Sequence, residues 1–99
     1  MTTLFIQEYT NLANDGHGQI VQAGKEPAVA SQVVTFTGTT ASAAFAASTR
    51  LVRISATGNC HLKFGATAPT ALTSHMKMMA NVPEYFGVSG ASFVAAIDA

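Results

Sequence analysis

Leu-Val-Arg-Ile-Ser-Ala-Thr-Gly-Asn-Cys-His-Leu-Lys-Phe, residues 51–64, carries the clearest structural signal in the chain. In its two halves, Leu51–Ala56 and Cys60–Phe64, every second residue is apolar and most of the residues between them are polar. This period of two is typical of strands that bury one face. The stretch therefore predicts two antiparallel strands joined by the short loop 57–59 into a hairpin.

The apolar residues select the register of this hairpin. With a three-residue loop, Ala56 lies opposite Cys60 and Ile54 lies opposite Leu62, so that all of them share one face. A two-residue loop would shift the register by one residue and mix the faces. Asn59 then occupies the left-handed position that such a loop requires, a conformation that asparagine tolerates.

The same register places Arg53 opposite Lys63 on the polar face, where like charges are unfavourable. Two arrangements would relieve this contact. Both side chains extend separately into water, or a carboxylate or a partner subunit lies over them.

Most of the chain has the same character, because short runs rich in Val, Ile, Thr, Phe and Tyr alternate with Gly, Asn, Asp, Ser and Pro. We therefore expect an all-β fold, a small β-sandwich, jelly-roll or barrel of about seven to eight short antiparallel strands. Tyr85 and Phe86 should lie on opposite faces of their strand, with one of them in the core. The expected strands are Leu4–Tyr9, Ile20–Gln22, Gln32–Thr37, Leu51–Ala56, Cys60–Phe64, Lys77–Met79, Glu84–Val88 and Phe93–Ile97.

Three other stretches are connections or remain open. Asn14–Gly18 is predicted to be a loop, and Ser89-Gly90 a hairpin turn. Thr39–Arg50 is rich in Ala and flanked by Ser and Thr. Its composition is compatible with a helix and equally with a loop that contains a short strand.

The N-terminal strand is apolar on both faces, since Leu4 and Ile6 point to one side and Phe5 to the other. Such a strand is either central in a sheet or covered by a neighbouring chain. The 99 residues fit one structural domain. Within it, residues 1–9 are candidates for an N-terminal arm or an intersubunit strand.

Composition narrows the classes of partner. Hydrophobic residues make up 48% of the chain and charged residues only 10%, against about 25% charged residues in an average protein. The net charge is zero, so nucleic acid has no basic surface to bind, and no apolar run reaches the roughly 20 residues of a membrane span. A small chain with so few charges is expected to associate with partners, including copies of itself.

The N-terminus reads Met-Thr-Thr-Leu-Phe-Ile-Gln-Glu and lacks the basic and apolar regions of a signal peptide. The single cysteine, Cys60, cannot form an internal disulfide. We therefore expect a protein that is made and assembled in a bacterial cytoplasm.

Residues that could carry chemistry are scattered. His17, His61 and His75 match no metal-ligand spacing, and the Gly-flanked loop around His17 lacks the Lys-Ser/Thr of a phosphate-binding loop. Cys60 falls on the apolar face of the predicted hairpin, where a free cysteine acts as a small apolar residue. We expect no enzyme activity, no cofactor and no metal site. No two acidic residues lie close together in the sequence; they are Glu8, Asp15, Glu26, Glu84 and Asp98.

Met76, Met78 and Met79 form a small cluster, which is either pliable core filler or an adaptable contact surface. The methionines, the N-terminal strand and the two opposed charges make up the candidate interface. Its residues are Leu4, Phe5, Ile6, Arg53, Lys63, Met76, Met78 and Met79.

Four pieces of the second half stand in a characteristic order. They are Phe-Ala-Ala-Ser-Thr-Arg-Leu-Val-Arg-Ile-Ser-Ala (45–56), Gly-Asn-Cys-His-Leu-Lys-Phe-Gly (58–65), Ala-Pro-Thr-Ala (68–71) and Ala-Asn-Val-Pro-Glu-Tyr-Phe-Gly-Val (80–88). In this order they resemble small structural proteins of tailed bacteriophages and prophages, of the head decoration or cement type. The resemblance implies a subunit on the outer capsid surface of the virion that binds the major capsid protein, stabilises the shell and favours a homotrimer. It implies no catalytic residues.

Other classes of function compete with this interpretation. A receptor- or carbohydrate-binding module of a tail fibre would expose more aromatic side chains than this Trp-free chain offers with Tyr9 and Tyr85. A tail or head–tail connector component is a second alternative. A cupin-type enzyme would need clustered His and Glu residues, which the sequence does not suggest.

Overall fold

The computed structural model describes residues 1–14, 16–17 and 19–99, with the backbone alone at residues 20–22. This part of the chain contains strands and no helix, hence no helix that could span a membrane. Runs of β-branched and aromatic residues favour this outcome. The strands are β1 (Thr2–Tyr9), β2 (Leu12–Asn14), β3 (Ile20–Gly24), β4 (Ala30–Phe36), β5 (Thr39–Ala41), β6 (Leu51–Ala56), β7 (Cys60–Gly65), β8 (Met76–Met78), β9 (Glu84–Gly87) and β10 (Phe93–Asp98).

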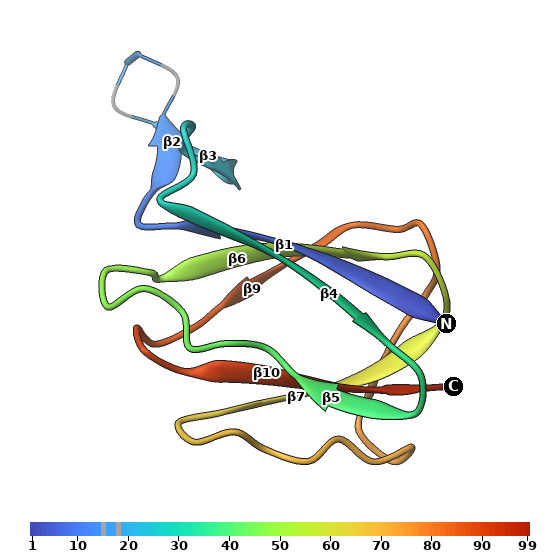
Figure 1. The fold of residues 1–99 in the computed structure, drawn as a ribbon. Coiled ribbons are helices and arrows are strands. Elements are labelled where there is room, and N and C mark those ends of the chain that lie inside the picture. Colours follow the sequence, from blue (N-terminus) through green and yellow to red (C-terminus); the bar gives the residue numbers. More distant parts are fainter. Residues whose placement is uncertain (15, 18) are drawn as a thin grey trace.

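Eight of these strands form two four-stranded antiparallel sheets that face each other (Figure 1). The first sheet has the order β4-β1-β6-β9 and the second has the order β5-β10-β7-β8. β2 and β3 pair separately, in a small hairpin at one end of the sandwich. The predicted all-β fold is confirmed, as a sandwich. The described residues hold ten strands and not seven or eight, because β2 and β5 are too short to give a periodic signal.

The core lies between the two sheets and takes alternate residues from each strand. Leu4, Ile6 and Ile54 point inward from the first sheet, and Leu62 and Val94 point inward from the second. Each of these side chains is at most 1% exposed. Burial of one such side chain contributes about 1.5–3 kcal/mol to stability.

β9 confirms the prediction that Tyr85 and Phe86 lie on opposite faces. Phe86 packs against the core, with its ring centre 5.1 Å from that of Phe64. Tyr85 points outward and is 40% exposed.

The predicted hairpin over residues 51–64 is wrong in its pairing, although its two strands do bury the predicted faces. β6 pairs with β1 and β9, whereas β7 pairs with β10 and β8. The loop 57–59 therefore crosses from one sheet to the other. Thr57 donates its N–H to the Thr3 carbonyl at 3.1 Å and accepts the Thr3 N–H on Oγ1 at 3.0 Å. Alternation of apolar and polar residues specifies only which face of a strand is buried. Two strands that each bury one face can be neighbours in one sheet, or they can face each other across the core from two different sheets.

Two predictions that depended on this hairpin are therefore wrong as well, the opposition of Arg53 and Lys63 and the left-handed conformation of Asn59. Arg53 lies beside Gln7 on the first sheet and Lys63 beside Ala95 on the second, so the two charges do not oppose each other. Asn59 does not adopt a left-handed φ.

Ser89-Gly90 is likewise not a hairpin turn, because it joins β9 of the first sheet to β10 of the second. Close packing explains why residue 90 is a glycine. A Cβ atom at Gly90 would lie 2.0 Å from the carbonyl oxygen of Ala47.

Thr39–Arg50 consists of the short strand β5 followed by a loop, and not of a helix. The loop returns to the first sheet beside the start of β10. Ser42 donates its N–H to Val94 O at 2.7 Å, and Phe45 donates to Ser92 O at 2.8 Å. These contacts replace the hydrogen bonds that a helix would have formed.

β1 occupies a central place in its sheet, between β4 and β6 of the same chain. The expectation that residues 1–9 form an arm or an intersubunit strand is therefore corrected: this strand is part of the chain's own sandwich. Its start is fixed to the end of the chain, since the Thr2 hydroxyl donates to Asp98 Oδ1. Figure 1 shows the two termini close together.

The β2–β3 hairpin covers Tyr9 at the end of β1. A Cβ atom at Gly24 would lie 2.4 Å from the Tyr9 ring, so the backbone packs directly on this ring. The Tyr9 hydroxyl donates to Glu26 Oε2 at 2.7 Å. The predicted loop Asn14–Gly18 includes residues 15 and 18, which lie outside the described residues, and the candidate acid Asp15 is therefore not placed.

Candidate functional site

Part of the outer face of the second sheet is covered by the chain itself, whereas Lys63 and Lys77 remain exposed there. Ala95 points away from the core and is nonetheless fully buried. The segment 66–75 runs along this side of the sandwich, with Ala71 only 1% exposed (Figure 1). His61, which faces outward from β7, fixes the segment through a contact of 3.0 Å between its Nδ1 and the His75 carbonyl oxygen.

The outer face of the first sheet is open over most of its area. Phe5 of β1 lies between Val33 of β4 and Ser55 of β6. The β2–β3 hairpin covers only the end at Tyr9. The open sheet face, as we use the term, consists of the outward residues Thr3, Phe5, Gln7, Ser31, Val33, Thr35, Arg53, Ser55 and Tyr85.

Large apolar and aromatic side chains are exposed on the open sheet face. Val33 is 65% exposed, Phe5 44% and Tyr85 40%. A shallow hollow of about 280 Å³ adjoins Phe5. It is lined by Phe5, Arg53, Ser55, Ala56, Thr57, Asn81 and Pro83. The face therefore offers apolar contact area with a shallow depression beside it.

Arg53 is the only charged residue of the open sheet face. In the register of the first sheet, Arg53 of β6 lies between Gln7 of β1 and Tyr85 of β9. A guanidinium group presents its N–H donors in a planar fork that matches a carboxylate. The arrangement is therefore suited to a partner surface that is mostly apolar and carries an acidic side chain.

The structure separates the residues predicted as an interface. Leu4, Ile6 and Met78 lie in the core and are at most 1% exposed, so they are not available on the surface. Phe5 and Arg53 belong to the open sheet face.

The remaining predicted residues lie on the second sheet or beside it. Lys63 is exposed on β7, and Met76 and Met79 are about half exposed at the β8 edge. Sequence reasoning missed Val33 and Tyr85 as partners of Phe5. The alternation in their strands indicates that they face outward, but no local pattern shows that these strands belong to one sheet.

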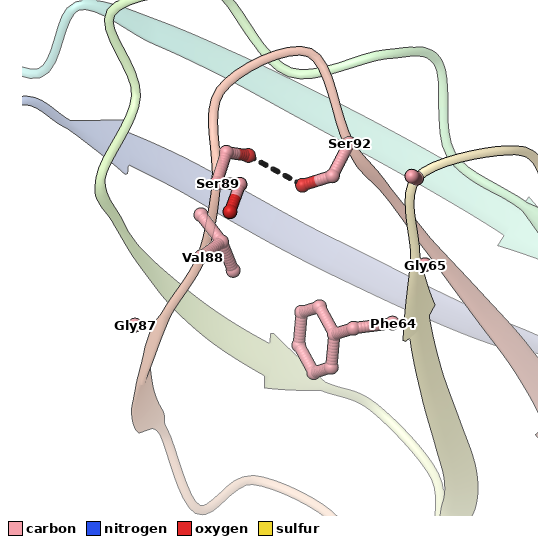
Figure 2. Close-up of a pocket in the computed structure, with 7 residues that line it drawn as sticks. Phe64, Gly65, Gly87, Val88, Ser89 and Ser92 are labelled. Atoms are coloured by element: carbon pink, nitrogen blue, oxygen red, sulfur yellow. Dashed lines mark hydrogen bonds between the residues drawn. The ribbon is translucent and has the colours of Figure 1, made fainter.

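A second hollow of about 260 Å³ opens at one end of the sandwich (Figure 2). Phe64 and Val88 supply its apolar wall, and the Ser92 hydroxyl donates to the Ser89 carbonyl within the adjoining loop. Its lining residues include no acid or base. They are Phe64, Gly65, Ala66, Gly87, Val88, Ser89 and Ser92.

The residues considered for chemistry remain apart. His61 and His75 serve the covering segment, and His17 is exposed near the β2–β3 hairpin. Cys60 is fully buried, and this burial, with a smaller contribution from the charge of Asp98, raises the pKa of its thiol. Among the residues described, no group of three or more His, Cys, Asp or Glu side chains could hold a metal ion.

Comparison of the chain with protein-family models, curated proteins and solved structures finds no match.

Proposed function

We propose that this chain is a non-enzymatic structural subunit of a bacteriophage virion, a capsid decoration protein that binds the major capsid protein through the open sheet face. One observation carries the proposal, the difference between the two outer faces of the sandwich. The chain covers part of one face with its own segment 66–75, on which Leu72 remains exposed, whereas the other face exposes Val33, Phe5 and Tyr85 of the sheet itself. Exposed apolar groups gathered on one face of a small protein are typical of a docking surface.

The geometry supports a subunit that acts by binding alone. A protein that binds the assembled shell more tightly than its separated parts stabilises the assembly by mass action. Two hydrogen-bonded sheets with a shared core hold the docking residues rigidly, so that little conformational entropy is lost on binding. In this proposal Phe5 and Tyr85 supply contact area, and Arg53 orients the subunit on an acidic group.

The viral context of the proposal comes from the sequence resemblance. It places the protein on the outer capsid surface after synthesis and assembly in the host cytoplasm. Self-association belongs to the proposal as well, since a charge-poor chain of this size gains burial from it. Nothing among the described residues selects the threefold symmetry that the resemblance favours.

Electron cryomicroscopy of purified virions that carry the gold-labelled chain tests this location. Label distributed over the whole capsid would support the proposal. Label at a single vertex or on the tail would contradict it and favour a connector or fibre component, and virions without label would contradict it as well.

A further inference from the structure

The four edge strands of the two sheets are unequally protected against pairing with another chain. β5 and β8 have three residues each, and β9 has four and follows Pro83. β4 has seven residues, Ala-Ser-Gln-Val-Val-Thr-Phe, without a charge or a proline. Monomeric proteins protect their edges with short strands, charges, prolines or bulges. β4 has none of these protections in its sequence or length.

The outer edge of β4 is also unoccupied within the part of the chain described. β4 pairs with β1 alone, and none of its backbone groups bonds to a loop. The loop that passes nearby is held by a side chain instead. Gln32 Oε1 accepts the Ala43 N–H at 3.0 Å, and Gln32 Nε2 donates to the Ala43 carbonyl at 3.1 Å.

We propose that β4 pairs in antiparallel orientation with β4 of a second copy of this chain, about a two-fold axis at Val33. This is the one two-fold register that uses all seven residues, because every shifted two-fold register loses two pairs or more. Opposite residues in an antiparallel pair lie on the same face, so the two cores fall on the same side of a continuous eight-stranded sheet. The pairs are Ala30 with Phe36, Ser31 with Thr35, Gln32 with Val34, and Val33 with its counterpart.

The strand is complementary to itself in charge and in shape. No charged residue occurs in the ladder, so no like charges face each other. Val33, 65% exposed in one chain, meets an identical side chain, and Phe5 of each copy flanks this pair on the same face. The pairing joins the two open sheet faces into one surface. It favours a dimer over the trimer that the resemblance implies.

Sedimentation equilibrium of the purified chain tests the dimer. The unmodified protein should have the mass of two chains. Val33→Lys should weaken the association at least ~10-fold, because it removes an apolar contact and places two ammonium groups opposite each other. Its circular dichroism should stay unchanged, since the side chain is largely exposed. Leu72→Lys is the matched control, because Leu72 is 53% exposed on the segment that covers the other sheet.

Cysteine substitutions test the register. A short bifunctional thiol reagent should join two copies of Val33→Cys, and should join Ser31→Cys to Thr35→Cys when the two variants are mixed. Ser31→Cys alone should not react in this way, because the two copies of position 31 are separated by about 14 Å along the strands. The unmodified chain gives the background, since its cysteine, Cys60, is buried.

Several results would overturn the proposal. The unmodified chain could sediment as a monomer or as a trimer, or Val33→Lys could associate as strongly as the unmodified chain. Cross-linking of Ser31→Cys alone, without cross-linking of Val33→Cys, would show a different register. A monomer whose Val33→Lys variant no longer binds capsids would assign the edge to a strand of the shell protein. None of the association measurements involves a capsid, so their failure is distinct from failure of the proposed function.

Discussion

Glu8 shows how a single polar residue organises the packing of the sandwich. It points inward from β1 and is 1% exposed, in a place where a carboxylate is costly unless it is hydrogen-bonded. Ala46 N and Thr49 Oγ1 donate to its Oε1 at 2.8 and 2.9 Å, and Gln32 Nε2 donates to its Oε2 at 3.1 Å. The carboxylate therefore ties β4 and the loop before β6 to β1.

Glu8→Gln should lower the free energy of unfolding by about 1.5–3 kcal/mol. The substituted amide group replaces an acceptor with a donor, so one of the three donors loses its partner. Urea denaturation measures the change. Glu84→Gln, at an exposed carboxylate, should change stability by less than about 0.5 kcal/mol. Equal stability of the two variants would contradict the structural role of Glu8.

Tyr9 makes the packing of the β2–β3 hairpin measurable by pH. Burial, followed by the hydrogen bond to Glu26 and its charge, raises the pKa of Tyr9 to about 12. The unfolded value is about 10, so the unfolded chain loses this proton first as the pH rises. The stabilisation from this group is complete below pH of about 10 and is lost between about 10 and 12.

The Tyr85→Phe variant isolates this titration, because Tyr9 is then the single tyrosine of the chain. Tyrosinate absorbance of the folded variant should rise with a midpoint above the usual pKa of about 10, because burial and Glu26, the largest causes of the raised pKa of Tyr9, remain. A midpoint near the unperturbed value of about 10 would show that the hairpin does not cover Tyr9.

At the scale of single elements, β9 separates a core residue from a surface residue at adjacent positions. Phe86→Ala should lower the free energy of unfolding by about 3 kcal/mol, since it removes a ring that packs on Phe64 and the core. Tyr85→Ala should cost less than about 1 kcal/mol, because Tyr85 is on the open sheet face. Thermal or chemical denaturation of both variants measures this difference, and equal losses would place the strand with the wrong face inward.

β1 is the element on which the first sheet depends. Deletion of Met1–Glu8 should abolish folding of the whole chain, because it removes the pairing partner of both β4 and β6 together with Leu4 and Ile6. Circular dichroism should show loss of the β signal. Deletion of Met1 alone, which is 89% exposed, should leave it unchanged. A folded protein lacking residues 1–8 would show that the strand is dispensable, as an arm would be.

Local patterns predicted which residues are strands and which side of each strand is buried. Val52, Ile54, Cys60 and Leu62 all face the core as their alternation indicates. Pairing between elements could not be predicted in the same way. The loop 57–59 is as compatible with a crossing between sheets as with a hairpin, and the choice depends on partners distant in sequence, such as Thr3.

At the scale of the whole molecule, the low proportion of charged residues and the difference between the two outer faces of the sandwich both favour the proposed docking. Only 10% of the residues are charged, and Arg53 is the only one of them on the open sheet face. A charge-poor surface loses little hydration energy when a partner covers it. The composition predicts association with partners, and the open sheet face is the surface that we propose for it.

The location of the candidate surface could be predicted only in part. Phe5 and Arg53 were identifiable as outward residues of strands, and both belong to the open sheet face. The contribution of Val33 and Tyr85 depends on the order β4-β1-β6-β9. The covering of the opposite sheet by segment 66–75 also depends on contacts between distant residues, such as His61 with His75.

The proposed docking through the open sheet face is tested most directly by binding of the purified chain to undecorated capsids of the bacteriophage to which the proposal assigns it. Co-sedimentation with the shells measures binding, after circular dichroism has shown that each variant is folded. Phe5→Asp and Tyr85→Asp should lose binding, because each places a charge in the apolar contact, whereas Leu72→Asp on the covered side should bind like the unmodified chain. Binding that survives Phe5→Asp and Tyr85→Asp, or that is lost with Leu72→Asp, would contradict the assignment of the open sheet face.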